Sequence, residues 1–96
     1  MAVLYHVASP KLARRYRATG AIVPPVRGFD TLLGAMWWAM KTNRTIVYAV
    51  ECDRRYPMPD HHNRFGNAVW TDEQVPVARI KCVVSAHRKD ADAAGE

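Results

Sequence analysis

The chain has 96 residues, of which 49% are hydrophobic and 24% charged, so it is long enough for one small core and too short for two domains. Its dispersed charges and ordinary apolar content exclude disordered, collagen-like and low-complexity chains. The longest apolar run, residues 32–40, falls short of the roughly 20 residues that a bilayer-spanning helix requires. The N-terminus lacks the pattern of a secretory signal, so we expect a cytoplasmic protein without a membrane anchor.

Basic charge is concentrated in the first half of the chain. Residues 1–48 carry seven Lys or Arg side chains against one acid, while the second half carries seven bases and eight acids. Four of the bases lie close together: Lys11, Arg14, Arg15 and Arg17. Such a surface attracts nucleic acid, another phosphate-bearing ligand or a partner protein, and its alternative is a solvated helix face.

The first twenty residues predict a strand followed by a helix. Residues 3–7 are β-branched and aromatic, which is typical of a strand, and His6 lies near its end. Ser9 provides an N-cap, Pro10 suits the first helical position and Gly20 suits a left-handed C-terminal residue. The spacing therefore predicts a helix over residues 10–19 that carries much of the basic surface.

The next segment predicts a short strand at 21–23, stopped by two prolines, then a loop that includes Arg27 and Gly28. Asp30 or Thr31 is expected to cap a second helix that runs to about Lys41. A wide apolar stripe predicts that this helix is largely buried: Leu32, Leu33, Met36, Trp37 and Met40. Of the adjacent Trp37 and Trp38, we expect one to pack inward and the other to line a neighbouring cleft.

The second half predicts three strands and a long loop. Residues 45–52 form a nearly continuous apolar run, which indicates a central strand covered on both faces. Residues 53–66 are polar and predict an irregular surface loop, and strands are expected at 67–71 and 75–84. Residues 85–96 have no apolar anchor and predict a disordered tail. The sequence thus predicts one domain over residues 1–84, of the α+β class, with two helices packed on a small split, mostly antiparallel sheet.

Two further features concern metals and thiols. Cys52 and Cys82 each lie in an apolar run, so both are interpreted as buried free thiols. Asp60, His61 and His62 are adjacent, yet neighbouring side chains on an extended segment point in opposite directions. No second ligand motif accompanies them, so no metal site is predicted.

The order of these elements resembles the ADP-ribosyltransferase superfamily, most closely the small rifampin ADP-ribosyltransferases and more loosely the poly-ADP-ribose polymerase core. The resemblance rests on Leu4-Tyr5-His6, on residues 20–24, 29–38 and 46–51, and on Gln74 to Ile80, which together span most of residues 3–84. It implies a small and possibly degenerate member that uses NAD as a substrate and transfers ADP-ribose to an unknown acceptor. No segment is specific alone; the ordered series carries the resemblance.

The resemblance also implies site residues. The histidine that closes the first strand binds the ribose or nicotinamide part of NAD, which matches His6, and an aromatic residue late in the second helix matches Trp38. Phe29 at the start of the second-helix segment belongs to the same binding set. Arg27 and Arg64 are expected to pair with the pyrophosphate.

The chain departs from the family at two places. Val7-Ala8 follows the histidine where the family usually has a small pair such as Gly-Thr, and Gly66-Asn67-Ala68 lacks the usual glutamate. Rifampin-type members bring an acid from the loop after the central strand, so Asp53, or second to it Asp60, is expected to act with His6 in catalysis. The alternative is a non-catalytic protein on the same scaffold that uses Lys11, Arg14, Arg15 and Arg17 to bind nucleic acid or a partner protein.

Overall fold

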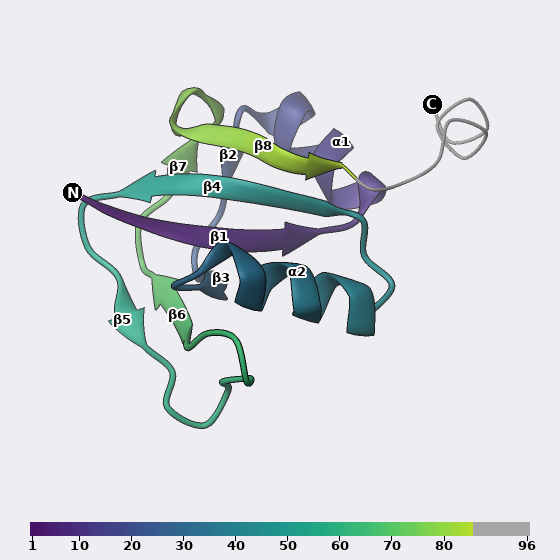
Figure 1. Cartoon of the computed structure of the whole chain (residues 1–96). Coiled ribbons are helices and arrows are strands. Elements are labelled where there is room, and N and C mark those ends of the chain that lie inside the picture. The colour runs from purple at the N-terminus through teal and green to yellow at the C-terminus, as the bar shows by residue number, and fades with distance from the viewer. Residues whose placement is uncertain (86–96) are drawn as a thin grey trace.

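A computed structural model describes residues 1–85 of the chain. Six strands form one antiparallel sheet in the order β5-β6-β3-β1-β4-β8, and their bounds are β1 Ala2–Ala8, β3 Val26–Phe29, β4 Ile46–Cys52, β5 Tyr56–Pro57, β6 Ala68–Thr71 and β8 Ile80–Ser85. Strands β2 (Ala21–Ile22) and β7 (Val75–Pro76) form a separate antiparallel pair. The helices are α1 (Pro10–Thr19) and α2 (Leu32–Lys41), and a short 3-10 turn spans Val77–Arg79. The predicted α+β class and the mostly antiparallel sheet are confirmed (Figure 1).

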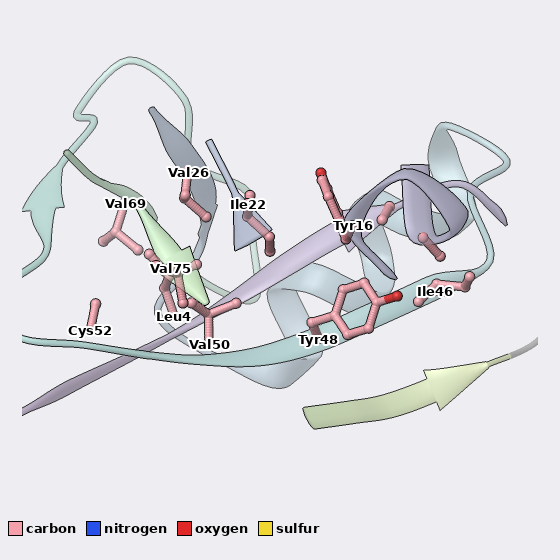
Figure 2. Packing of buried hydrophobic residues seen from close by; sticks show 12 residues of the cluster. Leu4, Tyr16, Ile22, Val26, Ile46, Tyr48, Val50, Cys52, Val69 and Val75 are labelled. Carbon is pink, nitrogen blue, oxygen red and sulfur yellow. The ribbon is translucent and has the colours of Figure 1, made fainter. Parts of the chain in front are cut away.

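The sheet is covered on both faces by different elements. On one face, Leu4 of β1 and Val50 of β4 pack in a core with Tyr16 of α1, and the β2-β7 pair contributes Ile22 and Val75 (Figure 2). On the other face, residues three positions away on the same strands, Val7 and Val47, pack with Ala35 and Ala39 of α2. Because side chains alternate along a strand, the two helices lie on opposite faces of the sheet. The prediction that residues 45–52 form a strand covered on both faces is confirmed.

Both helices begin and end where the sequence predicts. The Ser9 hydroxyl accepts a hydrogen bond from the Leu12 amide at 3.2 Å, and Gly20 adopts a left-handed φ of 81° after α1. The Thr31 hydroxyl caps α2 by accepting from the Gly34 amide at 3.0 Å. Asp30, the other candidate cap, instead accepts hydrogen bonds from the backbone and side-chain amides of Asn67. These caps satisfy amides that a helix leaves without partners.

Three predicted elements differ in the structure. Arg27 and Gly28 belong to β3 rather than to a loop, because their strand pairs with β6 and places Gly28 against the backbone of Tyr5. The predicted strand 75–84 is divided into β7, a 3-10 turn and β8, which pair with different partners. The predicted loop 53–66 contains the short strand β5. Of the predicted tail 85–96, Ser85 ends β8 and residues 86–96 lie outside the described part.

The burial of α2 and of one cysteine was predicted wrongly. Leu33, Met36 and Met40 are exposed, whereas the buried residues of α2 are the small Gly34, Ala35 and Ala39. A Cβ on Gly34 would lie 3.1 Å from the Cα of Gly66, so the helix approaches its neighbours through small residues and turns its large ones outward. Cys52 is buried as expected, but Cys82 is exposed because β8 is an edge strand.

Across the described residues, neither helix has the length and apolar character that crossing a bilayer requires.

Candidate functional site

A cleft of about 920 Å³ opens at the end of the sheet where β1 and β3 separate. Tyr5 pairs with Phe29 in the antiparallel ladder of β1 and β3. Beyond this pair, β1 runs on to Ala8, and β3 extends in its N-terminal direction to Val26. The walls of the cleft come from these strand ends, the first turn of α1, the last turns of α2 and the segment 58–64. Four separate parts of the chain therefore meet at this site.

Aromatic rings form one wall of the cleft. Trp37, Trp38 and Phe29 all line it, and the ring centroids of Trp38 and Phe29 are 6.3 Å apart. Trp38 keeps 38% of its surface exposed, so part of its ring is accessible to a ligand. The prediction that one of the two tryptophans packs inward is wrong, because both contribute to the cleft. Flat, accessible rings in a concave site are suited to stacking on a planar ligand group.

Positive charge dominates the polar part of the lining. Four cationic side chains line the cleft, Arg27, Lys41, Arg44 and Arg64, against one carboxylate, that of Asp60. The Lys41 ammonium lies 5.0 Å from the centroid of the Trp37 ring, which is the geometry of a cation–π contact. In the part of the chain that the structure describes, the one ion pair joins Arg79 and Asp53, so no carboxylate of that part is paired with the cations of the cleft. The site therefore attracts an anionic ligand.

His6 lies at the floor of the cleft with both ring nitrogens engaged. Its Nδ1 lies 2.6 Å from the carbonyl oxygen of Arg27, and its Nε2 lies 2.9 Å from the Tyr16 hydroxyl. A carbonyl only accepts, so Nδ1 carries the hydrogen and, in the neutral ring, Nε2 accepts from Tyr16. The His6 side chain thus bonds β3 where the β1–β3 ladder has ended. It links β1, β3 and α1 and holds the floor of the cleft together.

The surroundings of this pair favour neutral forms. Burial lowers the pKa of His6, and the nearby Arg44 guanidinium lowers it further, while the hydrogen bond to the Arg27 carbonyl acts in the opposite direction. Burial also raises the pKa of Tyr16, whereas Arg15 and Arg44 lower it. Both arginines are therefore close enough to act electrostatically on the Tyr16 hydroxyl, which bonds His6.

The segment that closes the cleft is fastened to the start of α2. The Thr31 hydroxyl donates to the Phe65 carbonyl at 2.7 Å, and the Asn63 side-chain amide donates to the Gly34 carbonyl at 3.0 Å. The backbones of Asn63 and Gly66 form a bridge that closes a tight turn. These bonds fix a polar segment that has no apolar core of its own, and they hold Asp60 and Arg64 at the rim.

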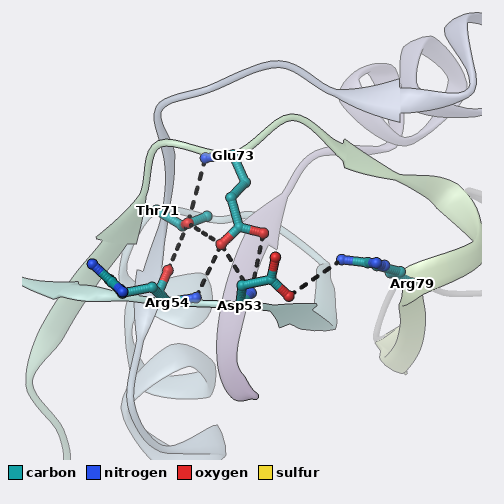
Figure 3. A network of polar contacts seen from close by, with 5 residues as sticks. All are labelled: Asp53, Arg54, Thr71, Glu73 and Arg79. Atoms are coloured by element: carbon teal, nitrogen blue, oxygen red, sulfur yellow. Dashed lines mark hydrogen bonds and ion pairs between the residues drawn. The ribbon is translucent and has the colours of Figure 1, made fainter.

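Asp53 lies apart from the cleft, in a separate polar network (Figure 3). Its carboxylate pairs with Arg79 at 3.8 Å, and its amide and that of Arg54 donate to the Glu73 carboxylate. The buried Thr71 hydroxyl donates to the Arg54 carbonyl at 2.7 Å. Hydrogen bonds from the Asp53 amide, chiefly, lower the pKa of Glu73. The network anchors the beginning of the segment whose later residues line the cleft.

The structure therefore brings together six of the seven predicted site residues and separates the seventh. The six are His6, Arg27, Phe29, Trp38, Asp60 and Arg64. Asp53, which we ranked above Asp60 because it follows an ordered strand, does not line the cleft, because it follows Cys52, which pairs with Ala2 at the end of β1 away from His6. Sequence reasoning missed Lys41, which ends α2, and Arg44, which lies three residues beyond it. It also missed the bond between His6 and Tyr16, for which the sequence gives no signal.

The remaining predicted features are the basic residues of α1 and the adjacent histidines. The helix α1 exposes Lys11, Arg14, Arg15 and Arg17. His61 and His62 line the cleft, and within residues 1–85 no three His, Cys, Asp or Glu side chains gather in a way that would hold a metal ion. A smaller cavity of about 340 Å³ lies between α1 and β8, and Tyr16 separates it from His6.

Comparison with protein-family models, with curated proteins and with solved structures finds no match to this chain.

Proposed function

We propose that the cleft binds NAD and that the protein transfers ADP-ribose from NAD to an acceptor. One observation carries the proposal: six of the seven residues that the sequence analysis assigns to NAD binding or to catalysis line a single cleft that combines aromatic rings, several cations and one carboxylate. NAD presents two planar bases joined through ribose groups by an anionic pyrophosphate, so each part of the ligand has a chemically matched wall.

The aromatic and cationic walls supply binding. Trp38, with its partly exposed ring, stacks on the nicotinamide, and Phe29 supports the Trp38 ring from 6.3 Å. Arg27 and Arg64, which both line the cleft, pair with the pyrophosphate. Fixing both halves of NAD in one geometry lowers the barrier by holding the scissile bond in position for attack.

Asp60 supplies the negative charge that the reaction requires. Cleavage of the bond between nicotinamide and ribose passes through a state with positive charge on the ribose, which a nearby carboxylate stabilises. The nicotinamide leaves with the electron pair of the broken bond, the acceptor forms the new bond to the same ribose carbon, and the acceptor's proton passes to Asp60 and then to water. Among the residues that line the cleft, Asp60 is the one carboxylate.

His6 acts in this proposal as a positioning residue. Its two nitrogens already bind the Arg27 carbonyl and the Tyr16 hydroxyl, so neither is free for NAD without breaking a bond within the protein. Through the Arg27 carbonyl, His6 sets where the Arg27 backbone lies in the cleft. Ligand contact with His6 is then through the face of its ring.

The test is a titration of tryptophan fluorescence with NAD, followed by measurement of released nicotinamide. We expect saturable quenching in the wild type and about tenfold or greater loss of affinity in Trp38→Leu, since stacking on an aromatic side chain contributes about 1–3 kcal/mol. Trp70→Leu is the matched control, because Trp70 packs on Tyr56 and does not line the cleft. For turnover, Asp60→Asn should abolish nicotinamide release and Asp53→Asn should retain it.

Two results would decide against the proposal. Absence of saturable quenching by NAD in the wild type removes both binding and catalysis. Binding of NAD without release of nicotinamide, with any acceptor tested, leaves the second candidate, a non-catalytic binding protein on this scaffold. The exposed basic residues of α1 favour that second candidate, because they lie outside the NAD cleft as drawn.

A further inference from the structure

The basic face of α1 and the cleft form one continuous electropositive surface. Leu12, in the first turn of α1, contributes to the wall of the cleft, and Tyr16 of the same helix bonds His6 at its floor. Lys11 and Arg15 are exposed neighbours on the helix surface because they lie four residues apart, and Arg15 lies three residues from Leu12. The lining cations Arg27 and Arg44 continue the positive surface inside the cleft.

Within the described residues 1–85, no carboxylate forms an ion pair with Lys11, Arg15, Arg27 or Arg44. No acidic residue precedes Asp30 in the chain, and α1 has no acid in its first turn. Within residues 1–85, the one ion pair is between Arg79 and Asp53, on another part of the molecule. NAD carries two negative charges at its pyrophosphate, whereas the cleft alone presents four cations against one carboxylate. The positive charge of the cleft that NAD does not neutralise, together with the basic residues of α1, attracts a second, polyanionic ligand.

From this continuity we infer that the acceptor is a single-stranded nucleic acid, whose backbone lies along α1 and whose reacting nucleotide enters the cleft. The inference rests on the proposed function and names its second substrate. Backbone phosphates match Lys11, Arg15 and Arg44, and Trp37, the lining ring that the proposed NAD contacts do not use, matches an unstacked base. A duplex keeps its bases stacked and out of reach, and an acidic peptide does not carry a planar group beside each of its charges.

The transfer to such an acceptor balances without any further reagent. A hydroxyl or ring nitrogen of the entering nucleotide forms a bond to the ribose carbon that carried nicotinamide. The bond to nicotinamide breaks, its electron pair leaves with neutral nicotinamide, and the proton of the attacking group passes to Asp60. The products are an ADP-ribosylated strand and nicotinamide.

The first measurement is fluorescence anisotropy of a labelled single strand of about 15 nucleotides. With about three phosphates neutralised, by Lys11, Arg15 and Arg44, the slope of log affinity against log salt is about −2.1, so affinity falls about eighteen-fold for a fourfold rise in salt. The double variant Lys11→Gln/Arg15→Gln should reduce the slope by about 1.4. The control Arg79→Gln/Lys81→Gln removes the same charge from a region that does not line the cleft and should leave the slope unchanged.

The second measurement follows nicotinamide release and the mass of the strand in the presence of NAD. We expect the single strand to accelerate release and to gain the mass of ADP-ribose, and the duplex of the same sequence to do neither. If NAD binds and the wild type does not bind the strand, or binds duplex equally well, the inference is overturned while the proposed function stands. If the strand binds and NAD does not, the proposed function fails and the acceptor role fails with it.

Discussion

Replacement of His6 by leucine tests the central polar link of the structure. Leucine keeps much of the volume but removes both hydrogen bonds, so the Arg27 carbonyl and the Tyr16 hydroxyl lose their partner. Leaving a buried polar group without a partner costs about 1–3 kcal/mol. Because both groups lie at the edge of the cleft and water reaches part of the site, we expect His6→Leu to lower the free energy of unfolding by about 2–4 kcal/mol at pH 7.5.

The same substitution has a defined pH signature. The pKa of His6 is lowered in the folded protein, chiefly by burial, from its ordinary value of 6.5. The unfolded chain therefore binds the proton more readily, and His6 contributes stability that is present above pH 6.5 and is lost as pH falls towards the folded pKa. Within that window, protonation at His6 lowers the free energy of unfolding of the wild type by up to about 1.4 kcal/mol for each unit by which the pH falls. Leucine does not titrate, so the gap between the two proteins narrows on acidification.

The assay is urea unfolding of both proteins at several pH values between about 7.5 and 5.5, a range that lies around the ordinary pKa of histidine. Taking the difference between wild type and His6→Leu removes the contribution of every other titrating group. A gap that stays constant or widens as the pH falls would refute the claim that His6 is held neutral by burial. A gap below about 0.5 kcal/mol at pH 7.5 would refute its structural role.

Three further predictions concern stability elsewhere. Gly28→Ala places a Cβ against the Tyr5 carbonyl oxygen of the neighbouring strand and should lower the free energy of unfolding by about 3 kcal/mol or more. Gly20 has open space around it but a positive φ, so Gly20→Ala should lower the free energy of unfolding by about 1–2 kcal/mol. Thermal unfolding compares the two variants. Thr71→Val leaves the Arg54 carbonyl without its buried partner and should lower the free energy of urea unfolding by about 1–3 kcal/mol. Because hydrogen bonds lower the pKa of Glu73, its stabilising contribution is present above pH 4.5 and is lost as the pH falls through the folded pKa. Solvent screens this exposed carboxylate, so Glu73→Gln should destabilise by about 0.5 kcal/mol at neutral pH and converge with the wild type in acid unfolding curves.

The local elements of this protein were predictable from the sequence. Ser9-Pro10 and Gly20 define α1 because an N-cap hydroxyl, a proline at the first position and a left-handed glycine act within a few residues of one another. The long apolar run at 45–52 predicts β4 for a similar reason, since a strand covered on both faces needs apolar side chains at nearly every position. The gathering of Arg27, Phe29, Trp38 and Arg64 was predicted only through the resemblance to a family.

Long-range pairing decided the rest. Arg27-Gly28 lacks a strand signal in the sequence. It belongs to β3 because β6, which lies about forty residues later in the chain, pairs with it, with Gly28 opposite Val69. The large residues of α2 face outward because Gly34 must approach Gly66 closely, a contact that no periodicity within the helix encodes. His6 is held by Tyr16 and by the Arg27 carbonyl, and Asp53 lies away from the cleft because the register of β4 places it beyond Ala2, at the end of β1 away from His6. Capping and periodicity are properties of neighbouring residues, whereas register, close approach and the partner of a buried polar group exist only once distant segments meet in the folded chain.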